Sequence, residues 1–227
     1  MSVRSARTEV AAALALAALC SACSSTPPAP QPAPRPISTA KAAPVAIPGA
    51  GWAGGRFVAY DSLAHGLSMP LPEDLGWNIQ DTKGAWLVAT HAAASTEIAV
   101  RTIATDGLAN RARCERRARD LRPLPEREGA TIVERRRVDL PDGFDTILEV
   151  GLLPTNPGEP IAGFLLAIGG WAKKCFVYAL VTRASGPGAE GAVGDRLALF
   201  VERSFLRLRF ESDLTPVVPR EKPPVGP

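Results

Sequence analysis

The sequence predicts an α+β domain in which an antiparallel β-sheet carries two main helices packed on it. Short segments rich in apolar and β-branched residues, which are typical of strands, fill most of residues 51–215. Two other segments of this region change to a helical period. The connections between neighbouring strand segments are as short as hairpin turns, and such turns join antiparallel strands.

The strand segments fall on both sides of the first helical segment. Before it, GRFVAYDSLAHGLSMPLP (55–72) predicts one or two short strands, and GAWLVATHAA (84–93) with STEIAVRTIAT (95–105) predicts a hairpin. After it, three or four strands are expected from ATIVERRRVDL, FDTILEVGLL and the long apolar run at 161–184. Asp142-Gly143 indicates a turn, and we expect the pair Gly169-Gly170 to divide the long run.

The first helix is predicted within residues 106–123 and is rich in arginine. Asp106 is the expected N-cap and Pro123 the expected stop. Its apolar face comprises Leu108, Cys114, Ala118 and Leu121.

The second helix is predicted from residue 191 to residue 208, after a glycine-rich loop. A helical stripe of residues is expected to pack on the sheet: Val193, Leu197, Phe200, Val201, Ser204, Phe205 and Leu208.

The N-terminal residues 1–22 have the pattern of an export signal. Arg4 and Arg7 precede an apolar run from Val10 to Cys20. This run is about half as long as the ~20 residues that a membrane-spanning helix needs. We therefore expect a signal peptide and not a transmembrane anchor.

The residues Ser21-Ala22-Cys23 resemble the lipobox of bacterial lipoproteins, in which two small residues precede the modified cysteine. This resemblance implies that Cys23 is lipidated and carries diacylglycerol and a fatty acyl group such as palmitate. One departure is Cys20, which stands where the family usually has leucine. Ser24 implies an exported chain anchored in the outer membrane and facing the periplasm. The alternative is ordinary cleavage, which would release a soluble periplasmic protein.

The remaining chain divides into a linker, a domain and a tail. Residues 23–50 form the lipidated N-terminus and a proline-rich linker, expected to be extended polyproline II and to act as a stalk. A proline-rich ligand for an SH3-like partner is the alternative. Residues 51–215 form the single α+β domain, and the proline-rich tail 216–227 is expected to be disordered.

Two cysteines lie inside the domain. Cys114 is on the apolar face of the first helix, and Cys175 is on an apolar strand. An oxidising compartment favours a disulfide between them. Two buried thiols are the alternative. A metal site is not predicted, because residues 51–215 have no CxxC motif and no nearby histidine pair, and no cofactor is implied.

An arginine cluster is the strongest surface feature of the sequence. It comprises Arg111, Arg113, Arg116, Arg117 and Arg119 on the first helix. Acids such as Glu115 and Asp120 are interleaved, so a solvated face is one interpretation. The other is a patch for an anionic partner: a lipid headgroup, a cell-wall polymer or an acidic protein. Nucleic acid is not an expected partner, because export separates the domain from it.

No motif in the sequence predicts catalysis. His91 with Ser95 or Thr96, or the adjacent acids Glu73 and Asp74, are the candidate groups for a hydrolase. However, there is no GxSxG elbow and no Walker loop. The GxGxxG spacing occurs at residues 49–54 and 186–191, but no Rossmann strand is expected before either stretch. We expect His91 to be a surface residue at a strand end, and we predict no catalytic residues and no enzyme activity.

The order of elements and two short stretches are similar to the PsbP/Mog1-like domains. These stretches are GLSMPLPEDLGWNI (66–79) and LFVERSFLRL (199–208), and the resemblance covers most of residues 55–210. Glu73, Asp74 and Leu75 widen the spacing that the family has between proline and glycine. The resemblance implies a fold whose members are mostly binding proteins, among them photosystem accessory proteins, a GTPase-binding protein and bacterial lipoproteins.

Together these features predict a non-catalytic, lipid-anchored binding or assembly module of the cell envelope. Its partner would be an envelope protein or the cell wall, and the membrane is reached through the lipid anchor. The alternatives are a periplasmic carrier of an apolar ligand and an envelope hydrolase. The sequence leaves the oligomeric state open.

Overall fold

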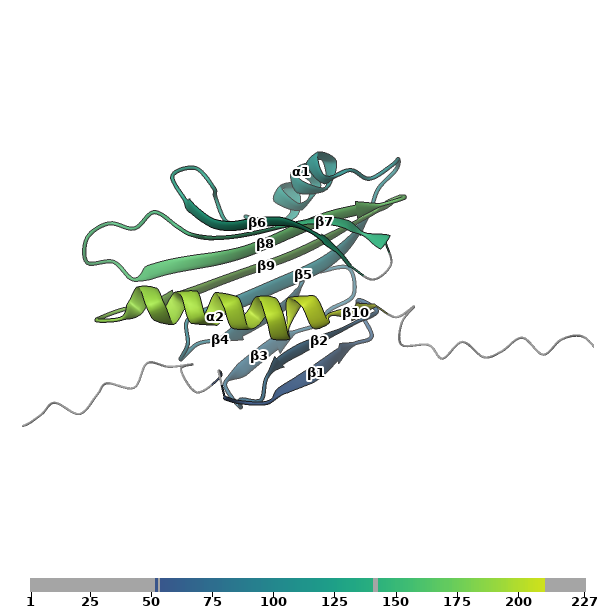
Figure 1. Ribbon diagram of the computed structural model, residues 1–227. Coiled ribbons are helices and arrows are strands. Elements are labelled where there is room, and N and C mark those ends of the chain that lie inside the picture. Colours follow the sequence, from purple (N-terminus) through teal and green to yellow (C-terminus); the bar gives the residue numbers. More distant parts are fainter. Residues whose placement is uncertain (1–51, 53, 141–142, 211–227) are drawn as a thin grey trace, which may run out of the picture. The chain divides into compact units, whose positions relative to one another are not determined.

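The computed structural model describes residues 52, 54–140 and 143–210 (Figure 1). The predicted signal peptide, Cys23, the linker up to residue 50 and the tail 216–227 lie outside the described residues. The elements within this part of the chain are β1 (Phe57–Ser62), β2 (Leu67–Pro72), β3 (Trp77–Gln80), β4 (Leu87–His91), β5 (Thr96–Ala104), α1 (Arg111–Leu121), β6 (Thr131–Asp139), β7 (Asp145–Leu152), β8 (Ile161–Trp171), β9 (Lys174–Ala184), α2 (Ala189–Arg203), a 3-10 turn (Phe205–Arg207) and β10 (Arg209–Phe210).

The strands form two antiparallel sheets, which confirms the α+β class. The smaller sheet has the order β1-β2-β10, and the seven-stranded sheet has the order β3-β4-β5-β9-β8-β7-β6. Every strand pair is antiparallel, including the predicted hairpin β4–β5, in which Leu87 pairs with Val100. The segment 55–72 contains two strands, as predicted.

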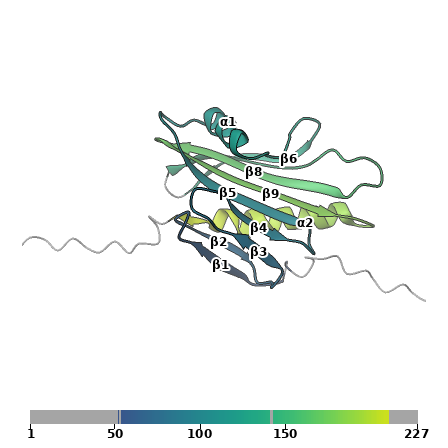
Figure 2. The ribbon, with the colours of Figure 1, turned by 180° about the vertical axis from the view of Figure 1, so that it is seen from behind.

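The two helices cover opposite faces of the seven-stranded sheet, as the two opposite views show (Figures 1 and 2). Alternation along β8 produces both faces: Leu165 and Ala167 pack on the α2 side, and Leu166 and Ile168 pack on the α1 side. The small sheet packs on the α2 side through residues such as Met69. Neither helix is long and apolar enough to cross a membrane, within the residues that the structure describes.

The stripe predicted for the second helix is confirmed, since all seven of its residues are buried. The helical run is divided, however. Helix α2 ends at Arg203, and the 3-10 turn at residues 205–207 continues the stripe.

Helix α1 begins later than predicted. Its N-cap is Asn110, whose side-chain oxygen accepts a hydrogen bond from the Arg113 amide at 2.9 Å. The assignment of Asp106 as the cap was wrong, and so was the placement of Leu108 on the apolar face. Residues 105–109 are instead bound to the β8–β9 turn, where the Ala109 amide donates to the Ala172 carbonyl at 2.7 Å.

The pair Gly169-Gly170 does not divide the long run, which corrects that prediction. Strand β8 continues to Trp171, and the turn comprises Ala172 and Lys173. The two glycines permit close approach: a Cβ on Gly169 would lie 2.2 Å from Thr146 Oγ1, and one on Gly170 would lie 3.1 Å from the Ala109 backbone. They are therefore required for packing and not for a turn.

Candidate functional site

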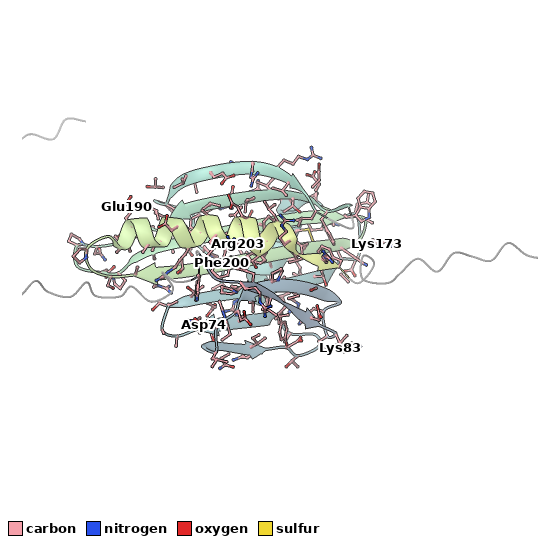
Figure 3. The ribbon with its side chains drawn as sticks, turned by 60° about the horizontal axis from the view of Figure 1, so that its bottom comes forward. Asp74, Lys83, Lys173, Glu190, Phe200 and Arg203 are labelled. Carbon is pink, nitrogen blue, oxygen red and sulfur yellow. A yellow bond between two sulfur atoms is a disulfide. The ribbon has the colours of Figure 1, made fainter. Side chains whose placement is uncertain are left out.

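An apolar groove lies between α2 and the β6–β7 edge of the large sheet. Its volume is about 530 Å³. The sheet contributes Val133, Val150 and Leu152, and the helix contributes Gly191, Gly194 and Ala198, with the acids Glu134 and Glu190 also in the lining. The groove extends along α2 from Glu190, which Figure 3 labels at one end of the helix, to Val201.

The groove exists because both of its walls lack large side chains that would fill it. Gly191, Gly194 and Ala198 lie at helical spacing on the face of α2 that is turned to the sheet edge. A Cβ added to either glycine would meet no atom within 4 Å. Opposite them, the pairing of β6 with β7 shifts between Ile132 and Glu134, and this bulge leaves Val133 mostly exposed. The chain thus leaves apolar surface uncovered here, where β6 is also the edge strand.

The predicted arginine patch consists of side chains with different surroundings. Arg111 donates to Glu149 at 2.9 Å, and Arg119 donates to Glu115 at 3.2 Å. Arg113 donates to the Leu108 carbonyl at 3.0 Å. Arg116 and Arg117 are exposed and have no acceptor within hydrogen-bond distance among the described residues. Recognition of an anionic partner by this helix stays a prediction.

Glu149, on β7, is the centre of an ion-pair network that sequence reasoning missed. It is only 4% exposed and contacts Arg111, Arg127 and Arg135 at 2.9, 2.8 and 3.2 Å. Arg127 also pairs with Glu115. Burial alone would lower the pKa of Arg127, but the hydrogen bonds and charges of the two glutamates raise it above its usual value. The available signal was that Glu149 stands between apolar residues in the middle of FDTILEVGLL.

His91 is buried, which corrects the expectation of a surface residue. It is 4% exposed because two indole rings cover the end of β4, with ring centroids 5.0 Å (Trp52) and 5.3 Å (Trp77) from the imidazole. Its Nδ1 accepts the Ala94 amide at 3.1 Å. Its Nε2 is 3.1 Å from Asp74 Oδ2, close enough for electrostatic attraction but not aligned as a hydrogen bond.

The structure brings together His91 and Asp74, two of the candidate hydrolase groups, but in an environment that keeps the acid ionised. Asp74 accepts hydrogen bonds from the Trp52 indole and from the Gly76 amide, both at 3.0 Å. These bonds, with the nearby His91, lower the pKa of Asp74. A general acid needs a raised pKa, so Asp74 does not have the property that this role requires.

The other candidate groups do not complete a catalytic constellation. Thr96 Oγ1 is buried and lies 2.8 Å from Thr182 Oγ1. Ser95 is exposed in the turn that follows β4. Glu73 accepts two hydrogen bonds from Arg56 at 2.8 and 2.9 Å, so the adjacent acids face different partners. Within residues 52, 54–140 and 143–210, no cluster of three or more histidines, cysteines or acids could hold a metal.

The predicted disulfide is confirmed. Cys114 on α1 is bonded to Cys175 on β9, across 61 residues of sequence. The bridge lies on the α1 side of the large sheet, and both cysteines are fully buried. It is remote in the fold from the groove, which lies on the α2 side.

Comparisons with known proteins yield distant similarity of fold. No family model matches the chain, and no curated protein matches it. Among solved structures, the Ran-binding protein Mog1p of Saccharomyces cerevisiae is similar at 8% identity and a TM-score of 0.48, over 69% of this chain and 96% of that one. A Bacteroides thetaiotaomicron protein is similar at 10% identity and a TM-score of 0.37, over 67% of this chain and 47% of that one. The similarity to a Mog1 protein concerns the fold alone, and membership in that family stays a prediction.

Proposed function

We propose that this protein is a non-catalytic binding or assembly module of the cell envelope, and that its groove beside α2 receives an apolar group of the partner. The observation that carries the proposal is an uncovered apolar groove of about 530 Å³, a volume within the usual range of ligand sites. Its lining holds two acids and no histidine, serine or cysteine. Such a lining favours binding over chemistry.

The proposal includes export, lipidation of Cys23 and attachment to the outer membrane on its periplasmic side. The disulfide agrees with an oxidising compartment. The proline-rich linker after Cys23 would reach about 75 Å if it is extended at ~3.1 Å per residue. A domain on such a linker can search for its partner while it stays attached to the membrane.

A carrier of an apolar ligand is the second candidate. The same groove supports it, because a volume of about 530 Å³ accommodates an acyl chain as well as side chains of a protein. The two candidates differ in what occupies the groove. A carrier purifies with a small molecule, and an assembly module contacts a macromolecule.

The test compares two neighbouring positions on α2. Gly194 lines the groove and has open space around it, whereas Asp195 is exposed and lies outside the groove. A photo-crosslinking amino acid is placed at each position in cells that make the full chain. We expect one discrete cross-linked product at position 194 and none at position 195. Native mass spectrometry of the purified chain then shows whether a small apolar molecule is bound.

Gly194→Phe should fill the groove, and Asp195→Phe is the matched control for the added ring. A protein product at position 194 that Gly194→Phe abolishes supports the assembly module. A bound small molecule that Gly194→Phe displaces supports the carrier. Equal cross-linking at positions 194 and 195 would contradict both candidate functions. The absence of any cross-linked product together with an empty groove would contradict them too.

A further inference from the structure

The turns at one end of the domain expose single apolar side chains. Leu63 in the β1–β2 turn is 97% exposed, Leu108 in the loop before α1 is 78% exposed, and Trp171 at the end of β8 is 57% exposed. These residues lie at the same end of the strands, because β1, β5 and β8 all end there. None of them belongs to the groove.

Leu108 and Trp171 are held close to each other by the backbone. The Ala109 amide donates to the Ala172 carbonyl at 2.7 Å, and the Thr105 amide donates to the Lys173 carbonyl at 2.8 Å. The turn that carries Trp171 has Ala172 at a φ of 48°, which is unfavourable for a residue with a side chain. The structure thus maintains a strained backbone at the position that exposes an indole ring.

Basic side chains lie beside these apolar residues, together with the exposed acids Asp61 and Asp106. Lys173 and Lys174 follow Trp171 and are exposed. Figure 3 shows Lys83, in the β3–β4 turn, at the same end as Lys173, and Glu190 at the opposite end. Asp145, which begins β7 beside this turn, is paired with Arg137 at 2.8 Å.

A polar pocket of about 510 Å³ lies beside Leu108. Arg113 and Arg117, one helical turn apart on α1, line it together with Thr105 and the acid Asp106. Arg113 uses Nη1 for the Leu108 carbonyl, and Arg117 has no acceptor among the described residues. The pocket therefore holds two guanidinium groups, one carboxylate and a threonine hydroxyl next to exposed apolar surface.

We propose that this end of the domain is a contact surface for an anionic bilayer. Arg113 and Arg117 bind a lipid phosphate, the lysines face the charged headgroups, and Trp171 and Leu108 enter the interfacial region. Tryptophan is enriched at that depth, and arginine and lysine are attracted to anionic leaflets. The inference deepens the proposed function, on which it rests for the nearness of a membrane. It also assigns the binding of an anionic partner, predicted for five arginines of the first helix, to Arg113 and Arg117.

A bilayer fits these observations better than an acidic protein does. The exposed apolar residues stand on three separate loops, and backbone hydrogen bonds hold the loops of Leu108 and Trp171 together. A protein interface buries a packed patch, whereas a headgroup layer accepts separate side chains, each at its own depth. The groove runs along α2 from Glu190 to Val201, and none of the residues proposed to contact the membrane lines it.

The test uses the mature chain purified from membranes and excess vesicles with brominated acyl chains, which quench nearby tryptophan. Trp171 is the natural reporter, because Trp52 and Trp86 are buried. The partly buried Trp77 pairs with His91, at the end of β3 away from the β3–β4 turn. Vesicles contain phosphatidylcholine alone or with phosphatidylglycerol. We expect at least twofold stronger quenching in the anionic vesicles, and Trp171→Phe should remove this difference.

Arg117→Glu and Arg116→Glu form a matched pair with the same charge change on adjacent exposed positions, only one of which lines the pocket. We expect Arg117→Glu to abolish the quenching in anionic vesicles and Arg116→Glu to reduce it slightly. An equal loss in both variants, or equal quenching in neutral and anionic vesicles, would overturn the proposal. Binding of soluble glycerol phosphate or of an acidic polypeptide without quenching in vesicles would overturn it too.

The lipidation of Cys23 is tested separately from the membrane contact of the turns. If intact mass shows no acyl group on the purified chain, the lipidation proposal is wrong. The excess of vesicles still reports membrane contact of the turns in that case. Retention of an acylated chain on vesicles without quenching of Trp171 would leave the anchor standing and reject the contact surface.

Discussion

The two faces of the seven-stranded sheet are held to their helices by different forces. Six residues of α2 are buried, and most of them are large and apolar. Helix α1 buries only Cys114 and Ala118. A disulfide and the ion pairs around Glu149 supply the remaining attachment of α1.

This difference follows from the sequences of the two helices. Arginines occupy most of the surface of α1, so little apolar area is left to bury. A helix of this kind depends on specific bonds, whereas α2 depends on contact area. The α2 side should therefore respond most strongly to loss of volume, and the α1 side to redox conditions and loss of charge.

The largest effect is expected from Phe200→Ala on the α2 side. The ring of Phe200 is fully buried and lies 5.7 Å from Trp52 and 6.0 Å from Phe57 between ring centroids. Its removal should lower the free energy of unfolding by about 4 kcal/mol, measured by urea denaturation. The half-exposed Leu206→Ala is the control and should cost less than about 1 kcal/mol. Similar costs for both variants would mean that burial does not hold this face.

The next effect concerns the disulfide on the α1 side. Cys114→Ser and Cys175→Ser should each lower the free energy of unfolding by about 3 kcal/mol, because the bridge closes a long loop. The double variant should equal either single variant, and reductant should destabilise only the parent protein. Additive losses in the double variant would show that the two thiols act separately.

Loss of charge at the ion-pair centre should have a smaller effect. Glu149→Gln leaves three arginines without their shared carboxylate and should cost about 2 kcal/mol in the free energy of unfolding. Glu134→Gln is the matched control on the neighbouring strand, where the pair with Arg136 is about half exposed. Its cost should be within about 0.5 kcal/mol. Equal costs would mean that the network adds nothing beyond a surface ion pair.

The smallest effect depends on pH and concerns Asp74. Its pKa is lowered in the folded protein, so the ionised form stabilises the fold above the ordinary aspartate value of about 4, and this contribution is lost as the pH falls further. Asp74→Asn should cost less than about 1 kcal/mol at neutral pH, because the side chain is partly exposed. Urea denaturation at several pH values should show the difference disappearing in acid. A difference that persists well below pH ~3 would reject this ionisation as the cause.

The regular parts of the fold were predictable because their signals are local. Apolar and β-branched composition predicted the hairpin β4–β5, and the predicted helical stripe is buried from Val193 to Leu208. Strand β3 was missed, because it has four residues and no fully buried side chain. The start of α1 was misplaced because both Asp106 and Asn110 are suitable caps, and only the contact with the β8–β9 turn decides between them.

The candidate site was less predictable than the fold. His91 is buried by Trp52, which is distant in sequence, so no local pattern could reveal its environment. The groove depends on Gly191 and Gly194, which have no side chains to fill it. A sequence lists residues but does not show the empty space between two elements of the fold. The disulfide was predictable, since the domain has two cysteines and the N-terminal pattern predicts export.

Trp52 has a mechanical consequence for a chain held at its N-terminal end. It precedes β1, which begins at Phe57, and its buried ring packs against Trp77, His91 and Phe200. A pulling force along the linker would enter the domain at this residue. The indole would have to leave its aromatic surroundings before the force reached β1. The contacts of Trp52 would therefore delay the unfolding of the sheets under load. Single-molecule stretching from the N-terminal end should show a first rupture that Trp52→Ala removes.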